Sequence, residues 1–307
     1  MERLILLRDF DHWFRQLPLR LPGISRQQFE PLRVRITEAL SALCQVEAFE
    51  LDTLREMTNR KRSSDEFVLT LDGGTYFKEY DFSFAMTRAV TRLSDVERGR
   101  MIRVAREGFG QFWTQVAMLR REYEESGKTT IVICDDGIDT GKSLSEVVRQ
   151  LMAQYLEVGG LRVLLNPHAI SELEGVAVES IVPPEVSLWT HERDLFWGSP
   201  GGGVSLISGN NVNQLCGIPY SLTSSLTSSL LKKRLGLAAD SLSELRNELL
   251  IVNREFWNLL SRAAGRPLRL RDAKRLIWAK DLNSDFSDKT EIVHVIDWLL
   301  THEPVLA

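Results

Sequence analysis

Two adjacent aspartates, Asp135 and Asp136, follow an apolar run and precede a small polar turn. The stretch reads IVICDDGIDTGKSL from Ile131 to Leu144. Its first four residues are apolar, as in a buried strand, and a helical pattern follows Ser143. Paired carboxylates at a strand end can bind hydroxyl groups or a divalent cation, and a bare backbone turn can bind an anion.

The turn has the features of a phosphate site. In an open parallel sheet, ligands bind beyond the carboxyl ends of the strands, where a following helix presents free backbone N–H groups and the positive end of its dipole. Gly141 allows close approach of the chain, and Thr140 and Ser143 add hydroxyl donors. Because a phosphate would repel Asp135 and Asp136, we expect these acids to serve the hydroxyls of a sugar and a shared divalent cation. The ligand indicated is a sugar phosphate.

The stretch resembles the phosphoribosyl pyrophosphate binding motif of type I phosphoribosyltransferases, in which apolar residues precede two acids and a Thr-Gly-x-Thr/Ser turn. Gly137 departs from this pattern, because the family usually has an aliphatic residue there. The resemblance implies that Asp135 and Asp136 face the ribose hydroxyls. It also implies that the 5-phosphate is held by the backbone of Thr140, Gly141, Lys142 and Ser143.

Two other interpretations apply to the same stretch. A P-loop is excluded because no glycine lies five residues before Gly141. The remaining alternative is a strand-to-helix turn whose aspartates only cap the helix.

A second loop matches the family's pyrophosphate loop. The segment FVLTLDGGTYF, Phe67 to Phe77, resembles the Leu-Lys-Gly-Gly loop of the hypoxanthine-guanine branch. The resemblance assigns Asp72, Gly73 and Gly74 to the departing pyrophosphate, whose charge the family neutralises with magnesium and backbone donors. Asp72 replaces the lysine of that branch and reverses its charge, so this loop would need a metal. A plain β-turn is the alternative.

The same branch implies residues for the base and for proton transfer. Asp139, directly before the Thr-Gly pair, is the expected acid/base. Asn166 in LLNPHAI stands where the branch uses a lysine to bind the purine. Because asparagine carries no charge, the identity of the acceptor base stays open. In VPPEVSLWTHERDLFW, Trp189 is expected to stack on the base and Asp194 to bind a second magnesium; the alternative for Trp189 is a core position.

The chain divides into three stretches. Residues 1–64 are expected to be a helical leader, 65–205 a mostly parallel α/β phosphoribosyltransferase-like domain, and 206–307 a mostly helical accessory domain. Between Lys78 and Gly127, where the family has strands and a flap, the segment 95–126 is predicted to form one or two long helices. Arginines crowd this region, mainly as solvated helix faces, with one or two expected to reach the pyrophosphate: Arg88, Arg92, Arg98, Arg100, Arg103 and Arg106.

Composition sets the remaining limits. The 307 residues are 43% hydrophobic with a formal charge of −4, which allows a large core and argues against binding nucleic acid over the whole surface. No apolar run is long enough for a membrane span, and the N-terminus lacks signal-peptide features, so we expect a cytoplasmic protein. Three isolated cysteines without metal spacing fit a reducing compartment.

The C-terminal third suggests an interaction surface. Leucine-rich helical stripes favour a homo-oligomer or a protein partner. The basic stretch from Ser261 to Lys280 is interpreted as a solvated helix or a contact with an acidic partner, with a nucleic-acid surface as the less favoured alternative.

Two function classes remain. The first is a magnesium-dependent phosphoribosyltransferase that joins phosphoribosyl pyrophosphate to a nitrogenous base or a related acceptor. The second is a sensor or regulator that binds phosphoribosyl pyrophosphate or a nucleotide without catalysis, in bacterial stress or defence and in contact with nucleic acid. Retention of both acids, Asp139 and the phosphate turn favours the enzyme.

Overall fold

The computed structural model has an α/β fold and divides into two compact units. Unit 1 comprises Met1–Ala48, Arg88–Arg103 and Thr190–Ala307, and unit 2 comprises Phe49–Thr87 and Val104–Trp189. The chain passes between the units within strands β2, β5, β6 and β11. The structure describes residues 3–17, 19, 21, 23–59, 62–92, 95, 102–106, 109–138, 141–166, 168–182, 188–207, 215–223 and 239–304.

Unit 2 is built on a six-stranded sheet with the order β4-β3-β7-β8-β10-β9. All neighbouring strands in it run parallel except β9 and β10, which are antiparallel. The strands are β3 (Glu66–Thr70), β4 (Phe82–Ser83), β7 (Thr130–Gly137), β8 (Val158–Leu165), β9 (Glu172–Leu173) and β10 (Val176–Ser180). The runs FVLTL, TTIVIC, LRVLL and VAVESIV therefore contribute strands, as their β-branched composition predicts.

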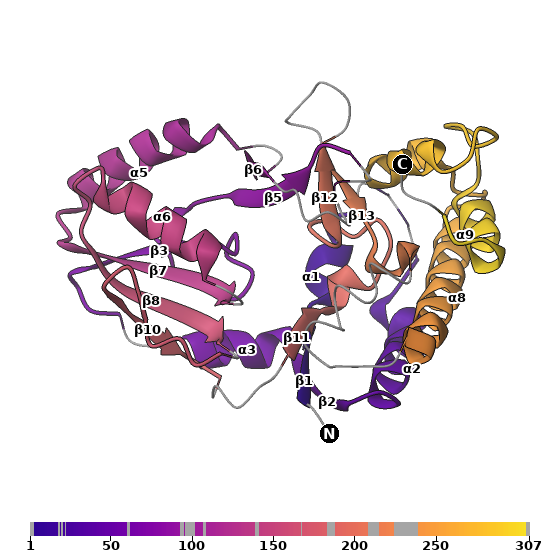
Figure 1. The fold of residues 1–307 in the computed structure, drawn as a ribbon, viewed down its shortest axis with the longest axis horizontal. Helices are drawn as coiled ribbons and strands as arrows, with labels where there is room; N and C mark the ends of the chain where they lie inside the picture. Colours follow the sequence, from indigo (N-terminus) through magenta and orange to yellow (C-terminus); the bar gives the residue numbers. More distant parts are fainter. Residues whose placement is uncertain are drawn as a thin grey trace. The chain divides into compact units, whose positions relative to one another are not determined.

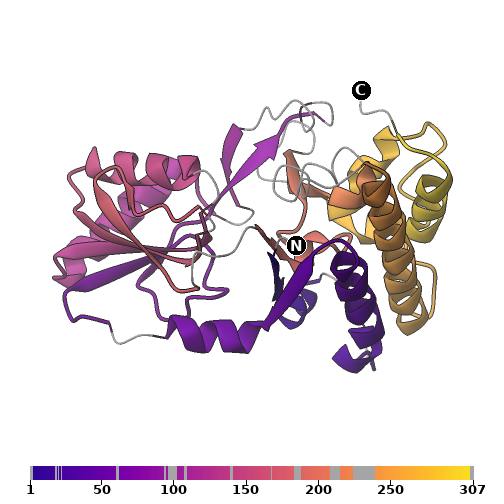
Figure 2. The same ribbon diagram turned by 60° about the horizontal axis from the view of Figure 1, so that its bottom comes forward.

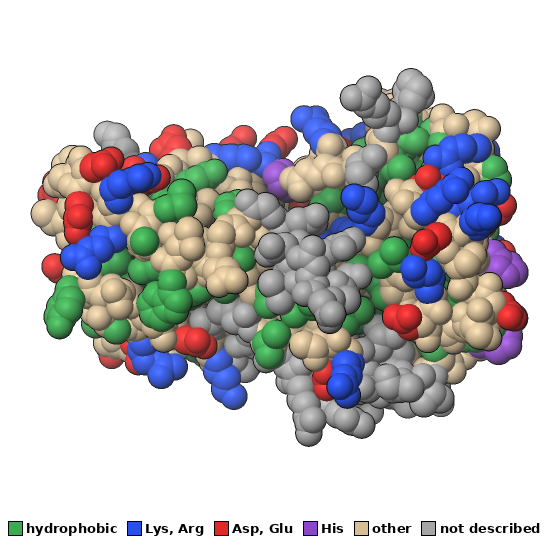
Figure 3. Space-filling view, turned by 90° about the horizontal axis from the view of Figure 1, so that it is seen from above, with side chains coloured by type: hydrophobic (Ala, Val, Ile, Leu, Met, Phe, Trp, Pro, Cys, Tyr) green, Lys and Arg blue, Asp and Glu red, His purple; other side chains and the backbone are tan. Residues whose placement is uncertain are grey.

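Helices α5 (Phe112–Ser126) and α6 (Lys142–Met152) lie along one face of this sheet (Figure 1). Alternate residues of β7, Ile131 and Ile133, point into the core on that face and pack against Leu119 of α5 and Val148 of α6. Helix α3 (Leu51–Thr58) lies on the other face. The outer surface of α5 and α6 carries hydrophobic side chains among acidic and basic ones (Figure 3).

Unit 1 contains two smaller sheets, with the orders β11-β1-β2 and β13-β12-β5-β6. Its long helix α8 runs beside α2 (Figures 1 and 2), and Arg35 of α2 binds Glu248 and Glu255 of α8 at 2.6 Å and 2.7 Å. The elements are β1 (Arg3–Arg8), α1 (Phe10–Phe14), η1 (Arg26–Phe29), α2 (Glu30–Ser41), β2 (Gln45–Glu50), β5 (Met86–Val90), β6 (Ile102–Ala105), β11 (Leu188–His191), η2 (Glu192–Asp194), β12 (Val204–Ile207), β13 (Leu215–Ile218), η3 (Tyr220–Leu222), α8 (Ala239–Ala263), η4 (Leu270–Asp272), η5 (Lys274–Asp281) and α9 (Ile292–Thr301).

An aromatic cluster joins the two ends of the chain inside unit 1. The Phe10 ring lies 5.4 Å from that of Phe196, and the Phe29 ring lies 5.4 Å from that of Phe256, centroid to centroid. All four side chains are buried. The N-terminal and C-terminal stretches therefore share one core, because these aromatic rings bury large areas against each other.

The observed units differ from the three-part division expected from the sequence. The stretch 1–64 contains strands β1 and β2 besides its helices, and it belongs mostly to unit 1 with Thr190–Ala307. The helical structure expected over 95–126 is shorter, because Ile102–Ala105 forms strand β6 and α5 starts only at Phe112. Of the helix expected over 221–237, residues 224–237 lie outside the described residues. Among the described helices, none has the length and apolar character needed to cross a bilayer.

Candidate functional site

The loops that follow β3 and β7 start side by side at one edge of the sheet in unit 2. The two strands are parallel neighbours, with Thr70 opposite Cys134. The backbone N–H of Leu71 donates to the carbonyl of Cys134 at 2.8 Å, so the ladder continues to the first residue of the loop. Asp72 comes one residue after this bond and Asp135 directly after Cys134. The expected pyrophosphate loop and the acid pair therefore lie at the same edge.

Asp72 holds its own loop together. Its carboxylate accepts hydrogen bonds from the backbone N–H groups of Gly74 and Tyr76, both at 2.7 Å, and from the Thr70 hydroxyl, and its side chain is only 4% exposed. Gly73 and Gly74 have φ angles of 71° and 72°, which side chains rarely adopt. The aspartate thus fixes a turn whose backbone shape needs both glycines, and this explains why a carboxylate stands where the resemblance expects lysine.

The acid pair is crowded and carries an unfavourable charge arrangement. The N–H of Asp136 donates to Oδ1 of Asp135 at 2.9 Å. Burial, followed by the neighbouring charge of Asp136, raises the pKa of Asp135 well above its usual value. Asp72 adds to this effect and Arg106 opposes it. A site of this kind favours a ligand that brings positive charge or hydrogen-bond donors to the carboxylates.

Arg106 brings a positive charge to this edge. Its backbone N–H donates to the carbonyl of Ala85 at 3.0 Å, and its Nε donates to that of Met86 at 3.2 Å. A Cβ atom placed on Gly73 would lie 3.4 Å from Nη1, so the guanidinium stands over the glycine turn. The sequence names Arg106 as one of six candidate arginines, and its position near Gly73 and Asp135 is known only from the fold. Arg92 is exposed, whereas Arg98, Arg100 and the side chains of Arg88 and Arg103 lie outside the described residues.

The turn after β7 leads into helix α6. Gly141 has a φ of 72° and precedes Lys142 and Ser143, the first residues of the helix. The first N–H groups of a helix have no intrahelical acceptor, so this end offers donors to an anion. Asp139 and Thr140 lie outside the described residues, so the expected acid/base and the threonine of the phosphate turn stay predictions.

The residues expected to bind the base have other contacts. The side-chain amide of Asn166 donates to the carbonyl of Ile170 at 2.8 Å and accepts from its N–H at 3.0 Å, which fastens the loop after β8. The Trp189 ring lies against Gly137, in the acid-pair strand. Asp194 belongs to unit 1, where it accepts the N–H of Gly203 at 3.0 Å. Asp194 and the acid pair therefore belong to different units, and its expected role as a magnesium ligand stays a prediction.

The acid pair suits a magnesium ion that is also bound by a ligand. Among the described residues, no group of three or more His, Cys, Asp or Glu side chains is arranged to hold a metal. Asp135 and Asp136 supply two carboxylates, and Mg²⁺ in proteins is commonly bound by one or two carboxylates together with substrate phosphates and water. The acid pair thus matches a magnesium ion that arrives with a phosphorylated ligand.

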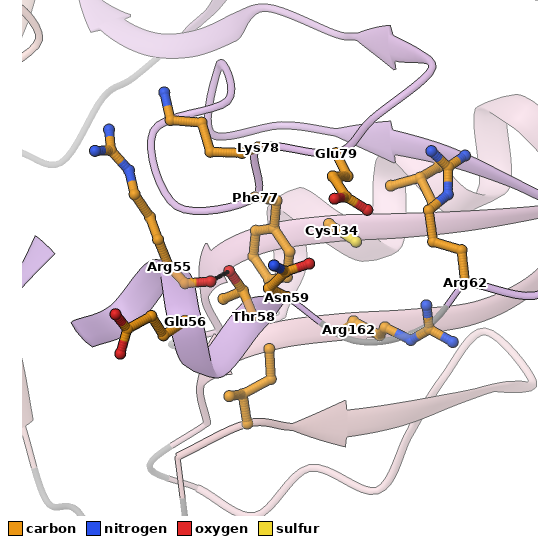
Figure 4. A pocket seen from close by; sticks show the side chains of 12 residues that line it. Arg55, Glu56, Thr58, Asn59, Arg62, Phe77, Lys78, Glu79, Cys134 and Arg162 are labelled. Atoms are coloured by element: carbon orange, nitrogen blue, oxygen red, sulfur yellow. Dashed lines mark hydrogen bonds between the residues drawn. The ribbon is translucent and has the colours of Figure 1, made fainter. Parts of the chain in front are cut away.

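A cavity of about 190 Å³ lies on the α3 face of the same sheet (Figure 4). Phe77 and Cys134 lie near its centre, with Arg62 and Arg162 on one side and Arg55 and Lys78 on the other. Arg162 makes two hydrogen bonds to Glu66, at 2.7 Å and 3.0 Å, and Arg62 shares Asp81 with Lys128. Acidic neighbours thus compensate the positive charges of these two arginines. The cavity also contacts Phe77, at the end of the loop that Asp72 holds together.

Cys134 separates the cavity from the acid pair and is expected to be chemically inert. Its side chain is 2% exposed, and burial raises the pKa of its thiol to about 12. Because the thiolate is the reactive form, the native protein should leave Cys134 unlabelled by iodoacetamide at pH 8, whereas protein unfolded in urea should be alkylated. Peptide mass spectrometry measures both states, and labelling of native Cys134 would contradict the burial.

Part of the basic stretch in unit 1 is paired. Arg266 binds Asp272 at 2.7 Å, Lys280 binds Asp288 at 2.9 Å, and Arg275 donates to the carbonyl of Gly202 at 3.3 Å. Figure 3 shows basic side chains, with some acidic ones among them, on the surface of this part of unit 1. This arrangement fits the expected solvated surface, and the nucleic-acid and protein partners of this region stay predictions.

Comparison with protein-family models, curated proteins and solved structures finds no match to this chain.

Proposed function

We propose that the protein is a magnesium-dependent phosphoribosyltransferase that uses phosphoribosyl pyrophosphate and a nitrogenous base or related acceptor. The proposal is supported chiefly by one observation: the glycine turn after β3 and the acid pair at the end of β7 meet at the carboxyl edge of a parallel sheet, with Arg106 near both. Phosphate donors, sugar-facing carboxylates and a cation then occur together.

Each group has a distinct role in this proposal. Asp135 and Asp136 orient the ribose through its hydroxyls, and the N-terminal N–H groups of α6 bind the 5-phosphate. The backbone of Gly73 and Gly74, together with Arg106, receives the negative charge of the departing pyrophosphate. Bound magnesium would supply further charge neutralisation to the phosphates. Asp139 is the proposed acid/base for the acceptor.

The proposal is tested by mixing the purified chain with magnesium, phosphoribosyl pyrophosphate and a panel of purine, pyrimidine and pyridine bases. Calorimetry measures donor binding, and an enzyme-coupled assay measures release of pyrophosphate. We expect micromolar donor binding that requires magnesium, with pyrophosphate release for at least one acceptor. No binding of the donor at millimolar concentration would reject both the enzyme and the donor-binding alternative.

Arg106 gives a residue-specific prediction. Replacing it with glutamine is expected to weaken binding of the magnesium–donor complex by about 10- to 100-fold, because a charged hydrogen bond to phosphate contributes about 1.5–3 kcal/mol. Ribose 5-phosphate, which lacks the pyrophosphate, should bind the variant and the wild type about equally. The control is Arg121→Gln on the outer surface of α5, where the side chain is 66% exposed. An equal loss for both ligands would contradict the pyrophosphate role.

A sensor or regulator without catalysis is the second candidate. It is favoured by Asn166, whose amide is occupied by Ile170, since no charged group then marks a purine site. Tight donor or nucleotide binding without pyrophosphate release from any acceptor would favour this candidate over the enzyme.

A further inference from the structure

Gly137 ends strand β7, two residues after Asp135 and four before Gly141. It pairs with Leu165 of β8, and the N–H of Ile138 donates to the Leu165 carbonyl at 2.9 Å. Gly137 is not among the glycines with positive φ. Its backbone conformation therefore accepts a side chain, and the requirement for glycine must come from its surroundings.

The surroundings are the indole of Trp189. A Cβ atom on Gly137 would lie 2.6 Å from Cζ2 and 2.9 Å from Cε2 of this ring, and 3.2 Å from the carbonyl oxygen of Leu165. The first two distances are too short for carbon atoms in contact, which approach to about 3.5–4.0 Å. The ring therefore fills the space of a side chain at position 137, where the phosphoribosyltransferase pattern has an aliphatic residue.

We infer that Trp189 is a positioning residue for the acid pair and the turn that follows it. Its half-buried indole packs on Gly137 and fixes the end of β7, so that the carboxylates of Asp135 and Asp136 keep their direction at the sheet edge. In this packing the ring occupies the space that an aliphatic side chain at position 137 would take. The effect on a bound ligand rests on the proposed function, whereas the packing itself does not.

This role differs from base stacking. The Cε2–Cζ2 edge of the ring is already in contact with the protein backbone. The positioning role acts through this edge and Gly137, and stacking of a ring face on a base stays a separate prediction.

A double-mutant cycle tests the inference with Gly137→Ala, Trp189→Phe and the double variant. The first readout needs no ligand: the backbone amide chemical shifts of Asp135, Asp136 and Gly141 in ¹H–¹⁵N spectra. Gly137→Ala should displace these shifts, and Trp189→Phe in the same chain should return them most of the way towards the wild type, because the smaller ring makes room for the methyl group. The control is Gly160→Ala in β8, where the nearest atom would be 3.9 Å from the new Cβ.

The second readout is the affinity for the magnesium–phosphoribosyl pyrophosphate complex. Gly137→Ala is expected to lose at least about 10-fold, and the cycle should show coupling of at least about 2-fold, as for residues in contact. Additive effects, or a double variant with shifts as displaced as Gly137→Ala, would overturn the inference. A lower melting temperature with unmoved amide shifts would also overturn it, since the contact would then be only structural. If the wild type binds no donor, the proposed function fails while the chemical shifts still decide the role of Trp189.

Discussion

Replacing Asp135 and Asp136 together by asparagine is expected to reduce the affinity for magnesium–phosphoribosyl pyrophosphate by at least about 100-fold. Charge-assisted hydrogen bonds to the ribose and metal contribute about 1.5–3 kcal/mol each, and both are lost in the double variant. Calorimetric titration measures the affinity, and circular dichroism establishes that the variant is folded. Asp65→Asn, at the amino end of β3, is the control and should bind like the wild type. Unchanged affinity in a folded double variant would remove the acid pair from the ligand site.

The same double variant should be more stable than the wild type when no ligand is present. The pKa of Asp135 is raised in the folded state by burial and by Asp136, so the ionised form is less favourable there than in the unfolded chain. Stability from this group is therefore full at low pH and falls as the pH rises above the ordinary aspartate value. Asparagine carries no charge and avoids this loss. We expect the urea midpoint of the double variant to be higher than that of the wild type at pH 8 but not at pH 4. The substitutions would thus raise stability while they lower the affinity for the donor.

Replacing Arg33 by methionine is expected to destabilise the protein by about 3–5 kcal/mol at pH 8. Arg33 and Glu192 are both 1% exposed, and Nε of the arginine donates to the carboxylate at 2.6 Å. Burial raises the pKa of Glu192 to about 7, although Arg33 opposes the shift. Without the arginine, Glu192 would at pH 8 be a buried charge that has lost its hydrogen-bonded cation, and the weaker effect of Arg8 would remain. Urea unfolding measures the change.

The pH dependence identifies the cause. The folded pKa of Glu192 lies above its value of 4.5 in the unfolded chain, so its ionisation costs stability as the pH rises through the range 4.5 to about 7. Loss of Arg33 raises this pKa further and extends the pH range over which ionisation of Glu192 costs stability. The destabilisation should therefore be smaller at pH 5 than at pH 8. Arg35→Met on the same helix is the control, since Arg35 is 33% exposed and its loss should cost about 1 kcal/mol or less. Equal destabilisation at both pH values would point to lost packing instead.

The strands of unit 2 could be predicted from the sequence because their signal is local. β-branched runs such as TTIVIC predict buried parallel strands, and the parallel register then brings the loops after β3 and β7 to one edge. The segment RLILLR was included in a helical leader but forms β1. Periodicity alone cannot distinguish a short apolar run in a strand from one in a helix, and pairing with distant β11 decides the outcome.

Within the candidate site, the sequence could predict proximity only for residues that are neighbours along the chain. Asp135 and Asp136 sit next to each other in sequence, so their proximity needed no fold. The position of Arg106 over Gly73 and of Trp189 against Gly137 depends on contacts between segments far apart in the sequence. The role of Asp72 was also hidden, because a carboxylate that accepts loop N–H groups has the same sequence signature as one that faces a ligand.

The passage of the chain between units within strands β2, β5, β6 and β11 has a mechanical consequence. Both ends of the chain belong to unit 1, so a pulling force applied at residues 3 and 304 acts first across unit 1. Unit 2 is inserted in unit 1, because both of its segments are joined to unit 1 segments at each end. Tension therefore reaches unit 2 only after unit 1 has unfolded. Stretching single molecules from their ends should therefore unfold the protein in a fixed order, with the acid-pair unit extending last.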